Sequence, residues 1–186
     1  MWVTRGSVSL ASLQIPASPT VAQLQGIPDG PEGTAQTLRA MRQDVRNAVR
    51  SPSQTIRSAA LQILQGLPAR KWLREVLALH AFVRDQIRYV SDPVGVQIVQ
   101  TPEKTLELGQ GNCVQKSVLL SSLLESTGHP TRFVALEIKG QSDGQFSHVL
   151  VETKVGTRWL PLESIIPVPA GWYPPDAGKR YVLDVS

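Results

Sequence analysis

The sequence predicts an α+β domain in which helices come first and an antiparallel sheet follows. Apolar residues recur at helical spacing in four segments between residues 34 and 127, and the apolar period then changes to two between residues 132 and 166. A chain of 186 residues is also long enough for one domain with its own core. Because strands follow the helices instead of alternating with them, the order of elements favours α+β over α/β.

The chain divides by composition into three parts. Residues 1–33 are rich in serine, proline, glycine and glutamine, and we expect an extended N-terminal arm that is poorly ordered unless something binds it. Residues 34–70 are expected to form a basic helical segment, and residues 71–186 the core with a C-terminal extension. Positive charge gathers in one region, because residues 36–74 contain eight lysines and arginines but only one acid.

The basic segment is predicted to contain two helices. The first covers residues 34–50 and carries four apolar residues at helical spacing, Leu38, Met41, Val45 and Val49. The second is expected to begin at Ser51-Pro52-Ser53-Gln54, which has the pattern of an N-cap, a proline at the first helical position and a capping-box residue. Gly66 is its expected end.

Two more helices are predicted in the core. Residues 72–89 place one apolar stripe on a helix, made of Leu73, Val76, Leu77, His80, Val83 and Ile87. Residues 113–127 are apolar around much of the helix circumference, contain interleaved serines, and end at Gly128. We expect this last helix to be buried at the centre of the fold. Three strands should follow it, over residues 132–139, 146–154 and 158–166.

The composition excludes several classes of protein. No apolar run approaches the roughly 18 residues needed to cross a bilayer, so no membrane span is expected. The first seven residues lack the basic and apolar regions of a secretory signal, which favours a cytoplasmic location. The single cysteine, Cys113, cannot form an internal disulfide or a multi-thiolate zinc site. We therefore expect a free thiol, and neither a cofactor nor a metal.

The position of Cys113 favours a nucleophile. Gly109-Gln110-Gly111-Asn112 places the thiol where a glycine-rich loop meets the central helix, with Gly111 or Asn112 as the cap. Free backbone N–H groups at a helix start favour an anion, and the thiolate is the nucleophilic form of cysteine. The alternative is an unreactive buried cysteine, which is a common role for this residue.

A nucleophilic cysteine needs a base, and the base needs an orienting partner. The sequence offers three histidines. His80 lies in an apolar stripe and is expected to be a core or boundary residue, whereas His129 lies in a Gly-His-Pro turn and is expected to be solvated. His148 lies in a predicted strand and is the best candidate for the base.

Strand alternation suggests the partner of His148. If the hairpin is symmetric about Val155-Gly156, His148 lies directly opposite Glu163 on a shared face, close enough for the carboxylate to hold the imidazole. Two alternatives stay open at this point. The two residues could form an ordinary cross-strand surface pair, or a one-residue bulge could break the alignment.

The order of these motifs resembles the transglutaminase-like superfamily. The resemblance covers about residues 72–166, and its segments follow the family's order: Ile87-Arg88-Tyr89, Thr101-Pro102-Glu103-Lys104-Thr105-Leu106, Gly109 to Cys113, Leu123 to Val134, Ser147 to Glu152, and Trp159-Leu160-Pro161-Leu162-Glu163. No single motif is specific, but their joint order and spacing are.

The resemblance implies a papain-related fold and assigns roles to the residues. Cys113 would be the nucleophile, His148 the general base and acid, and Glu163 the residue that orients the histidine. Family members usually have aspartate where Glu163 stands, and often an acid where Asn112 stands. Tyr89 and Gln97 are candidates for a second oxyanion donor beside the Cys113 backbone N–H, although each also suits a structural role.

Three functions compete. We favour a cysteine-dependent hydrolase of a peptide or carboxamide bond, with a protein or peptide substrate, because the domain is minimal. The first alternative is a transglutaminase that cross-links proteins at glutamine. The second is a non-catalytic binding module that docks on a partner through the N-terminal arm and the basic helices.

Neither nucleic acid nor a membrane is an expected partner. A solvated helix face is the commoner explanation of spaced arginines, and aromatic residues for base stacking are sparse near them. Small chains of this kind also resemble transglutaminase-like proteins of tailed phages and prophages. A virion-associated role, in a bacterial or phage-infected cell, is therefore a further alternative.

Overall fold

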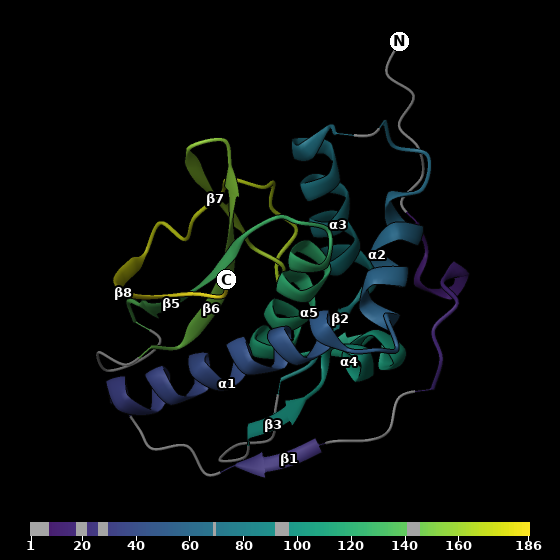
Figure 1. Cartoon of the computed structure of the whole chain (residues 1–186). Coiled ribbons are helices and arrows are strands. Elements are labelled where there is room, and N and C mark those ends of the chain that lie inside the picture. Colours follow the sequence, from purple (N-terminus) through teal and green to yellow (C-terminus); the bar gives the residue numbers. More distant parts are fainter. Residues whose placement is uncertain (1–7, 18–21, 26–29, 69, 92–96, 141–145) are drawn as a thin grey trace.

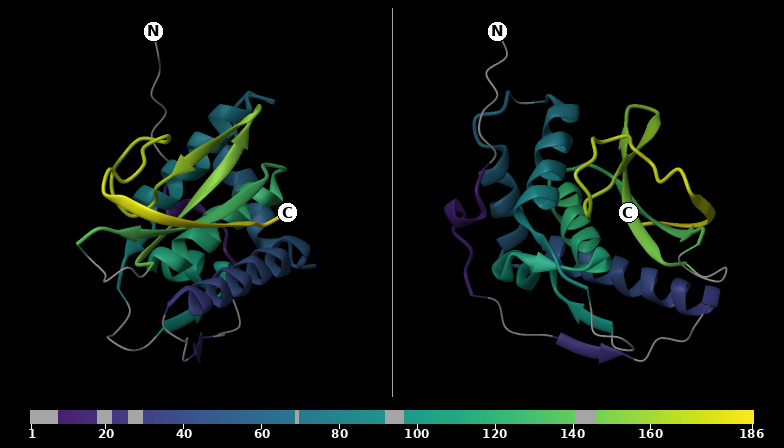
Figure 2. Two further views of the ribbon diagram at one scale, coloured as in Figure 1. Left: turned by 90° about the vertical axis from the view of Figure 1, so that its left-hand side faces the viewer. Right: turned by 180° about the vertical axis from the view of Figure 1, so that it is seen from behind.

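The chain folds into a layer of helices packed on one face of a four-stranded antiparallel sheet. The computed structural model describes residues 8–17, 22–25, 30–68, 70–91, 97–140 and 146–186. Figure 1 shows the helices on one side and the sheet on the other, with helix α5 (Cys113–Ser126) between them. The two further views in Figure 2 show the same central position of α5.

Helix α5 is the centre of the core, as its sequence predicts. Eleven of its fourteen residues are buried, including the polar side chains of Lys116, Ser117 and Ser121. The other helices surround it, and they are α1 (Gly30–Arg50), α2 (Thr55–Leu64), α3 (Trp72–Gln86) and α4 (Pro102–Leu108). Since a helix that is apolar all round must be covered all round, these neighbours are what allow α5 to form.

The sheet has the strand order β7-β6-β5-β8, and every neighbouring pair is antiparallel. Its strands are β5 (Thr131–Ile138), β6 (His148–Val155), β7 (Arg158–Leu162) and β8 (Ala177–Asp184). The expected α+β class, with a central cysteine-bearing helix on an antiparallel sheet, is thereby confirmed. Strand β8 was not predicted from the sequence pattern, although it pairs with β5 along most of its length.

Serines on α5 fix this helix against the sheet. Ser117 Oγ donates to the Val149 carbonyl oxygen of β6 at 3.3 Å, and Ser121 Oγ lies 2.6 Å from Thr131 Oγ1 of β5. The small serine side chains let the backbone of α5 approach the sheet, and each of these buried hydroxyl groups forms a hydrogen bond with a strand. Because Ser117 is one turn beyond Cys113, the first of these bonds sets the start of α5 against the start of β6.

Two short sheets lie outside this core. Strand β1 (Ala22–Gln25) pairs antiparallel with β3 (Gln97–Gln100), and β2 (Arg88–Tyr89) pairs parallel with β4 (Gln110–Gly111). The β2–β4 pair places Tyr89 beside Gly111, just before the start of α5. A short 3-10 helix, Leu10–Ser12, lies in the N-terminal segment and packs on the core through Leu10.

Several helix details differ from the sequence predictions. Helix α1 begins at Gly30 and includes Pro31, which the first turn of a helix tolerates. Helix α2 begins at Thr55, and its N-cap Gln54 has a left-handed φ of 55° with no capping side chain, so the predicted cap at Ser51 is wrong. In α3, the predicted stripe residues Leu73 and Leu77 are exposed.

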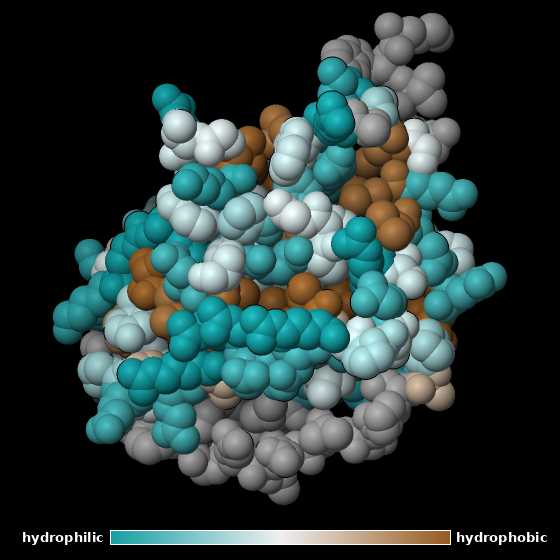
Figure 3. Space-filling view, in the orientation of Figure 1, coloured by the Kyte–Doolittle hydropathy of each residue, from teal (hydrophilic) through white to brown (hydrophobic). Residues whose placement is uncertain are grey.

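The outward side of α1 is hydrophilic (Figure 3). Its arginines do not form one uniform face, however. Arg39 and Arg50 are exposed, whereas Arg42 is half-buried and Arg46 donates from Nε to the Val185 carbonyl oxygen at 3.0 Å. No helix in the described part of the chain is long and apolar enough to cross a membrane.

Candidate active site

Cys113 is the first residue of α5, and a capping box holds the chain that leads into it. Asn112 Oδ1 accepts a bond from the Gln115 backbone N–H at 2.9 Å, and Gln115 Oε1 accepts one from the Asn112 N–H at 3.0 Å. Of the two predicted caps, Asn112 is therefore the correct one. Because a first-turn N–H has no acceptor within its own helix, the Cys113 N–H remains outside the helical ladder.

Gly111 has no side chain for a steric reason. A Cβ atom at this position would lie 2.9 Å from Gln115 Cβ, a distance that real contacts do not show. The glycine lets the backbone pass close to the capping box just before the cysteine. The glycine-rich sequence before Cys113 thus has a packing role in positioning the thiol.

His148 connects Cys113 to Glu163 through hydrogen bonds. The histidine is the first residue of β6, and its Nε2 lies 2.6 Å from Glu163 Oε2. The Cys113 side chain also hydrogen-bonds the same ring. The His148 side chain is 15% exposed and that of Glu163 is 2% exposed. The cysteine is half-buried.

The strand register that brings His148 to Glu163 differs from the predicted one. Val155 pairs with Arg158 around a two-residue turn at Gly156-Thr157, so the ladder is shifted by two positions from a hairpin centred on Val155-Gly156. A shift by two keeps every side chain on its predicted face. His148 and Glu163 are therefore diagonal neighbours, and Glu163 lies just beyond the end of β7.

The charges at this site stabilise one another. Burial by itself lowers the pKa of His148, but the hydrogen bonds and negative charges of Cys113 and Glu163 outweigh it and raise the pKa to about 9. Burial raises the pKa of Glu163, yet the adjacent His148 and the Ile165 and Ser164 backbone donors bring the net pKa below its ordinary value. The site therefore favours an imidazolium at His148 paired with the Glu163 carboxylate.

The sequence profile of the transglutaminase-like superfamily matches residues 57–164, which is more than half of the chain. The chain belongs to the transglutaminase-like superfamily. This membership agrees with a cysteine-dependent, hydrolase-like function in general terms. A comparison with curated proteins found no match.

Two solved structures resemble this transglutaminase-like chain. One is a candidate protease from Parabacteroides distasonis, with 14% identity and a TM-score of 0.57. The alignment covers 92% of the present chain and 35% of the Parabacteroides chain. The other is a candidate cysteine protease from Cytophaga hutchinsonii, with 14% identity and a TM-score of 0.48, covering 77% of this chain and 51% of its own. The present chain thus spans about a third and about half of their lengths. At this identity the first likeness shows the fold.

His80 supports Glu163 in a way that sequence reasoning missed. It is 1% exposed, as expected for a core residue, but its Nε2 lies 2.5 Å from the Glu163 carbonyl oxygen. Burial lowers the pKa of His80, so the ring is neutral near pH 7 and donates from Nε2. Helix α3 thereby fixes the backbone of Glu163. A histidine in an apolar stripe was the only sequence signal for this role.

A buried lysine, Lys116, lies close enough to Glu163 to be affected by its charge. Lys116 Nζ donates to the carbonyl oxygens of Ile87, at 2.5 Å, and Arg84, at 3.4 Å, at the end of α3. Burial lowers its pKa to about 8, although the negative charges of Glu163 and Asp85 favour the ammonium form. The lysine thus caps α3 and ties it to α5 one turn after the cysteine.

The remaining predicted site residues have different outcomes. Tyr89 lines the same cavity as Cys113 and His148, so it lies in the region expected for an oxyanion donor. The side chain of Gln97 lies outside the described residues. His129 was expected to be solvated, and this is wrong, because it is 1% exposed, bonds Glu75 Oε2 at 3.1 Å and meets the Trp72 ring edge-on.

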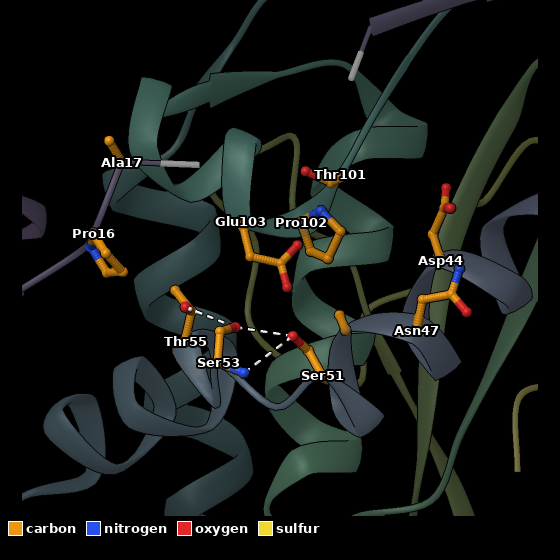
Figure 4. A pocket seen from close by; sticks show the side chains of 11 residues that line it. Pro16, Ala17, Asp44, Asn47, Ser51, Ser53, Thr55, Thr101, Pro102 and Glu103 are labelled. Atoms are coloured by element: carbon orange, nitrogen blue, oxygen red, sulfur yellow. Dashed lines mark hydrogen bonds between the residues drawn. The ribbon is translucent and has the colours of Figure 1, made fainter. Parts of the chain in front are cut away.

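A cavity that is larger than the two cavities lined by Cys113 lies elsewhere in the molecule (Figure 4). Its volume is about 440 Å³, and it lies between α1, the Ser51–Thr55 loop and the start of α4. Burial, helped by repulsion from Glu103, raises the pKa of Asp44 to about 6. Its lining contains two carboxylates but no thiol or imidazole, so it provides no nucleophile with a base. No cluster of described residues has the ligands for a metal ion.

Proposed function

We propose that this protein is a cysteine-dependent hydrolase that cleaves a peptide or carboxamide bond through an acyl-enzyme. The observation that carries the proposal is the continuous set of hydrogen bonds from Cys113 through His148 to Glu163. A thiol, an imidazole and a carboxylate in this order are the parts that nucleophilic catalysis by cysteine requires.

Each residue has a distinct part in the reaction. The Cys113 thiolate attacks the acyl carbon, and a C–S bond forms as the carbonyl electrons move to oxygen. The His148 imidazolium then gives its proton to the leaving amine, and the C–N bond breaks. Water next attacks the thioester with neutral His148 as base, the acid leaves, and the thiolate returns. Glu163 keeps the imidazole ring oriented throughout.

The start of α5 supplies an oxyanion donor. The Cys113 N–H is outside the helical ladder and lies next to the sulfur, which suits the oxygen of a tetrahedral intermediate. Tyr89 is the best available second donor, because it lines the cavity that also contains Cys113 and His148. The helix dipole adds to the stabilisation of negative charge at this position.

Hydrolysis is the favoured outcome for the thioester because the site is open to water. Cys113 is half-buried, and two cavities that reach solvent meet at its side chain. Acyl transfer to an amine would use the same three residues. The amine acceptor would then have to exclude water from a site that is accessible from both sides.

The first test measures the reactivity of the thiol. Iodoacetamide near neutral pH should alkylate Cys113 much faster than it alkylates free cysteine, and His148→Ala should slow the reaction toward the rate of the free thiol. His129→Ala is the matched control, because this buried histidine pairs with Glu75 and does not contact Cys113. An unperturbed, base-dependent rate in the wild-type protein would favour a non-catalytic module.

The second test separates the two reactions. The protein is incubated with fluorogenic peptides, and in parallel with a glutamine-containing protein and a dansylated amine. We expect peptide cleavage that Cys113→Ala abolishes. Incorporation of the amine without cleavage would identify a transglutaminase instead.

A further inference from the structure

Two cavities meet at Cys113 and differ in chemistry. Both are lined by Cys113, Ser147 and His148, so a chain that passes over the sulfur would enter one on each side. The smaller, about 160 Å³, is bounded by α1 through Leu38 and Met41, and none of the described residues that line it is acidic, a lysine or an arginine. The larger, about 380 Å³, falls in the size range of sites that bind small molecules.

The larger cavity is bounded by residues outside the family match. The match ends at residue 164, and the segment 165–176 follows it before strand β8 begins. Five residues of this segment line the cavity, namely Ile165, Ile166, Trp172, Pro174 and Asp176. The reacting groups therefore lie within the family match, whereas part of the cavity wall comes from the segment that follows it.

Asp176 gives this cavity an unbalanced negative charge. Among the described residues of the lining, the other carboxylate is Glu163, which is already paired with His148. Lys139 donates its backbone N–H to the Asp176 carbonyl oxygen at 3.1 Å. Among the described residues, however, no basic side chain forms an ion pair with the Asp176 carboxylate, and this includes the ammonium group of Lys139.

The apolar part of the lining suits an aliphatic stem. Ile165, Ile166 and Pro174 provide apolar surface, and Trp172 provides an aromatic ring that can contact methylene groups and attract a cation. Lysine and arginine side chains combine such a stem with a positive end. A neutral apolar side chain would fill the same surface but would leave Asp176 without a partner.

We propose that the cavity of about 380 Å³ is a specificity subsite for a lysine or arginine side chain next to the bond that Cys113 attacks. The inference rests on the proposed function, since it names the substrate class for the same site. The cationic end would pair with Asp176, and the stem would lie against Ile165 and Trp172. The smaller cavity, without a charge of this kind, would accept an apolar side chain on the other side.

The test compares lysine with norleucine, which has a similar stem but no charge. Each residue is placed first on one side of the target amide and then on the other. Every peptide is assayed for hydrolysis and, separately, for protection of Cys113 from iodoacetamide. In the wild-type protein the lysine peptide should protect about threefold better than its norleucine match, as expected for an ion pair with an exposed carboxylate. The substitution Asp176→Asn should remove this difference.

A matched variant controls for overall charge. Asp184→Asn changes the charge equally at an exposed residue of β8 that does not line the cavity, and it should keep the lysine preference. The alkylation rate of Cys113 without peptide shows whether each variant is folded.

The two readouts separate the subsite from the reaction. Lysine-selective protection without any hydrolysis would support the subsite and contradict the proposed hydrolase. Equal protection by the two peptides in the wild-type protein, or a preference that survives Asp176→Asn, would overturn the subsite whatever the hydrolysis rate.

Discussion

The substitution Glu163→Gln isolates the contribution of the carboxylate charge to His148. Glutamine has nearly the same size and can keep a hydrogen bond, but it cannot balance an imidazolium. In the structure, Glu163 Oε2 lies 2.6 Å from His148 Nε2, and both side chains are largely buried. The change therefore removes charge from a site where solvent screening is weak.

The size of the effect follows from the kind of bond that is lost. A hydrogen bond to a charged group contributes about 1.5–3 kcal/mol, which corresponds to a decrease of about 10- to 150-fold in kcat/KM. The pKa of His148, about 9 in the intact site, should fall toward its ordinary value of 6.5. The leaving amine needs the protonated ring, so the basic limb of the pH–rate profile should move to lower pH.

Two measurements follow this shift. The pH dependence of kcat/KM reports the basic limb, and the NMR titration of the His148 ring reports its protonation directly. Stability should change with the same group. Since the folded-state pKa exceeds 6.5, its stabilising contribution is complete below pH 6.5 and is lost as pH rises toward 9. The variant should lose this pH dependence between 6.5 and 9.

Two further variants make the result specific. Glu163→Asp keeps the charge and should retain more activity than the glutamine variant. Glu152→Gln removes another buried carboxylate from the same sheet, one that pairs with Arg132 at 2.6 Å. It should leave the His148 titration unchanged. If Glu163→Gln kept full activity and an unshifted basic limb, the assignment of Glu163 as the orienting residue would be refuted.

Two other predictions concern the residues that hold the site in place. Asn112→Ala should destabilise the protein by about 1 kcal/mol, the usual effect of losing a helix N-cap, and lower Tm by about 2–4 °C; an unchanged Tm would show that the capping box adds no stability. His80→Phe should lower kcat about fivefold with little change in KM, because a neutral buried hydrogen bond to the Glu163 backbone contributes about 1 kcal/mol. His80→Gln, which keeps a donor, should recover part of kcat. An equal loss in both His80 variants would mean that the ring acts only by packing.

Local sequence patterns predicted the parts of the site that depend on neighbouring residues. The pattern of residues 113–127, apolar around much of the helix circumference, predicted a central buried helix, and the glycine-rich loop placed Cys113 at its start. Alternation placed His148 and Glu163 on one face. The register was wrong because it depends on which two residues form the turn, and alternation is the same for every even shift.

Long-range contacts were beyond these patterns. His80 meets Glu163 across 83 residues of sequence, and Lys116 caps a helix that ends about thirty residues earlier. The His129–Glu75 pair is of the same kind. Strand β8 and the segment before it were missed because proline and glycine interrupt the alternation there. These contacts depend on how the layers pack, which periodicity does not specify.

The most direct test of the central claim is to trap the acyl-enzyme. The protein is mixed with an excess of an activated peptide ester, quenched in acid within one turnover, and examined by intact mass and peptide mapping. We predict that the acyl group is found on Cys113, that its formation slows with His148→Ala, and that Cys113→Ala carries none. Product formation without an acyl group on Cys113, or at an equal rate in Cys113→Ala, would contradict the account.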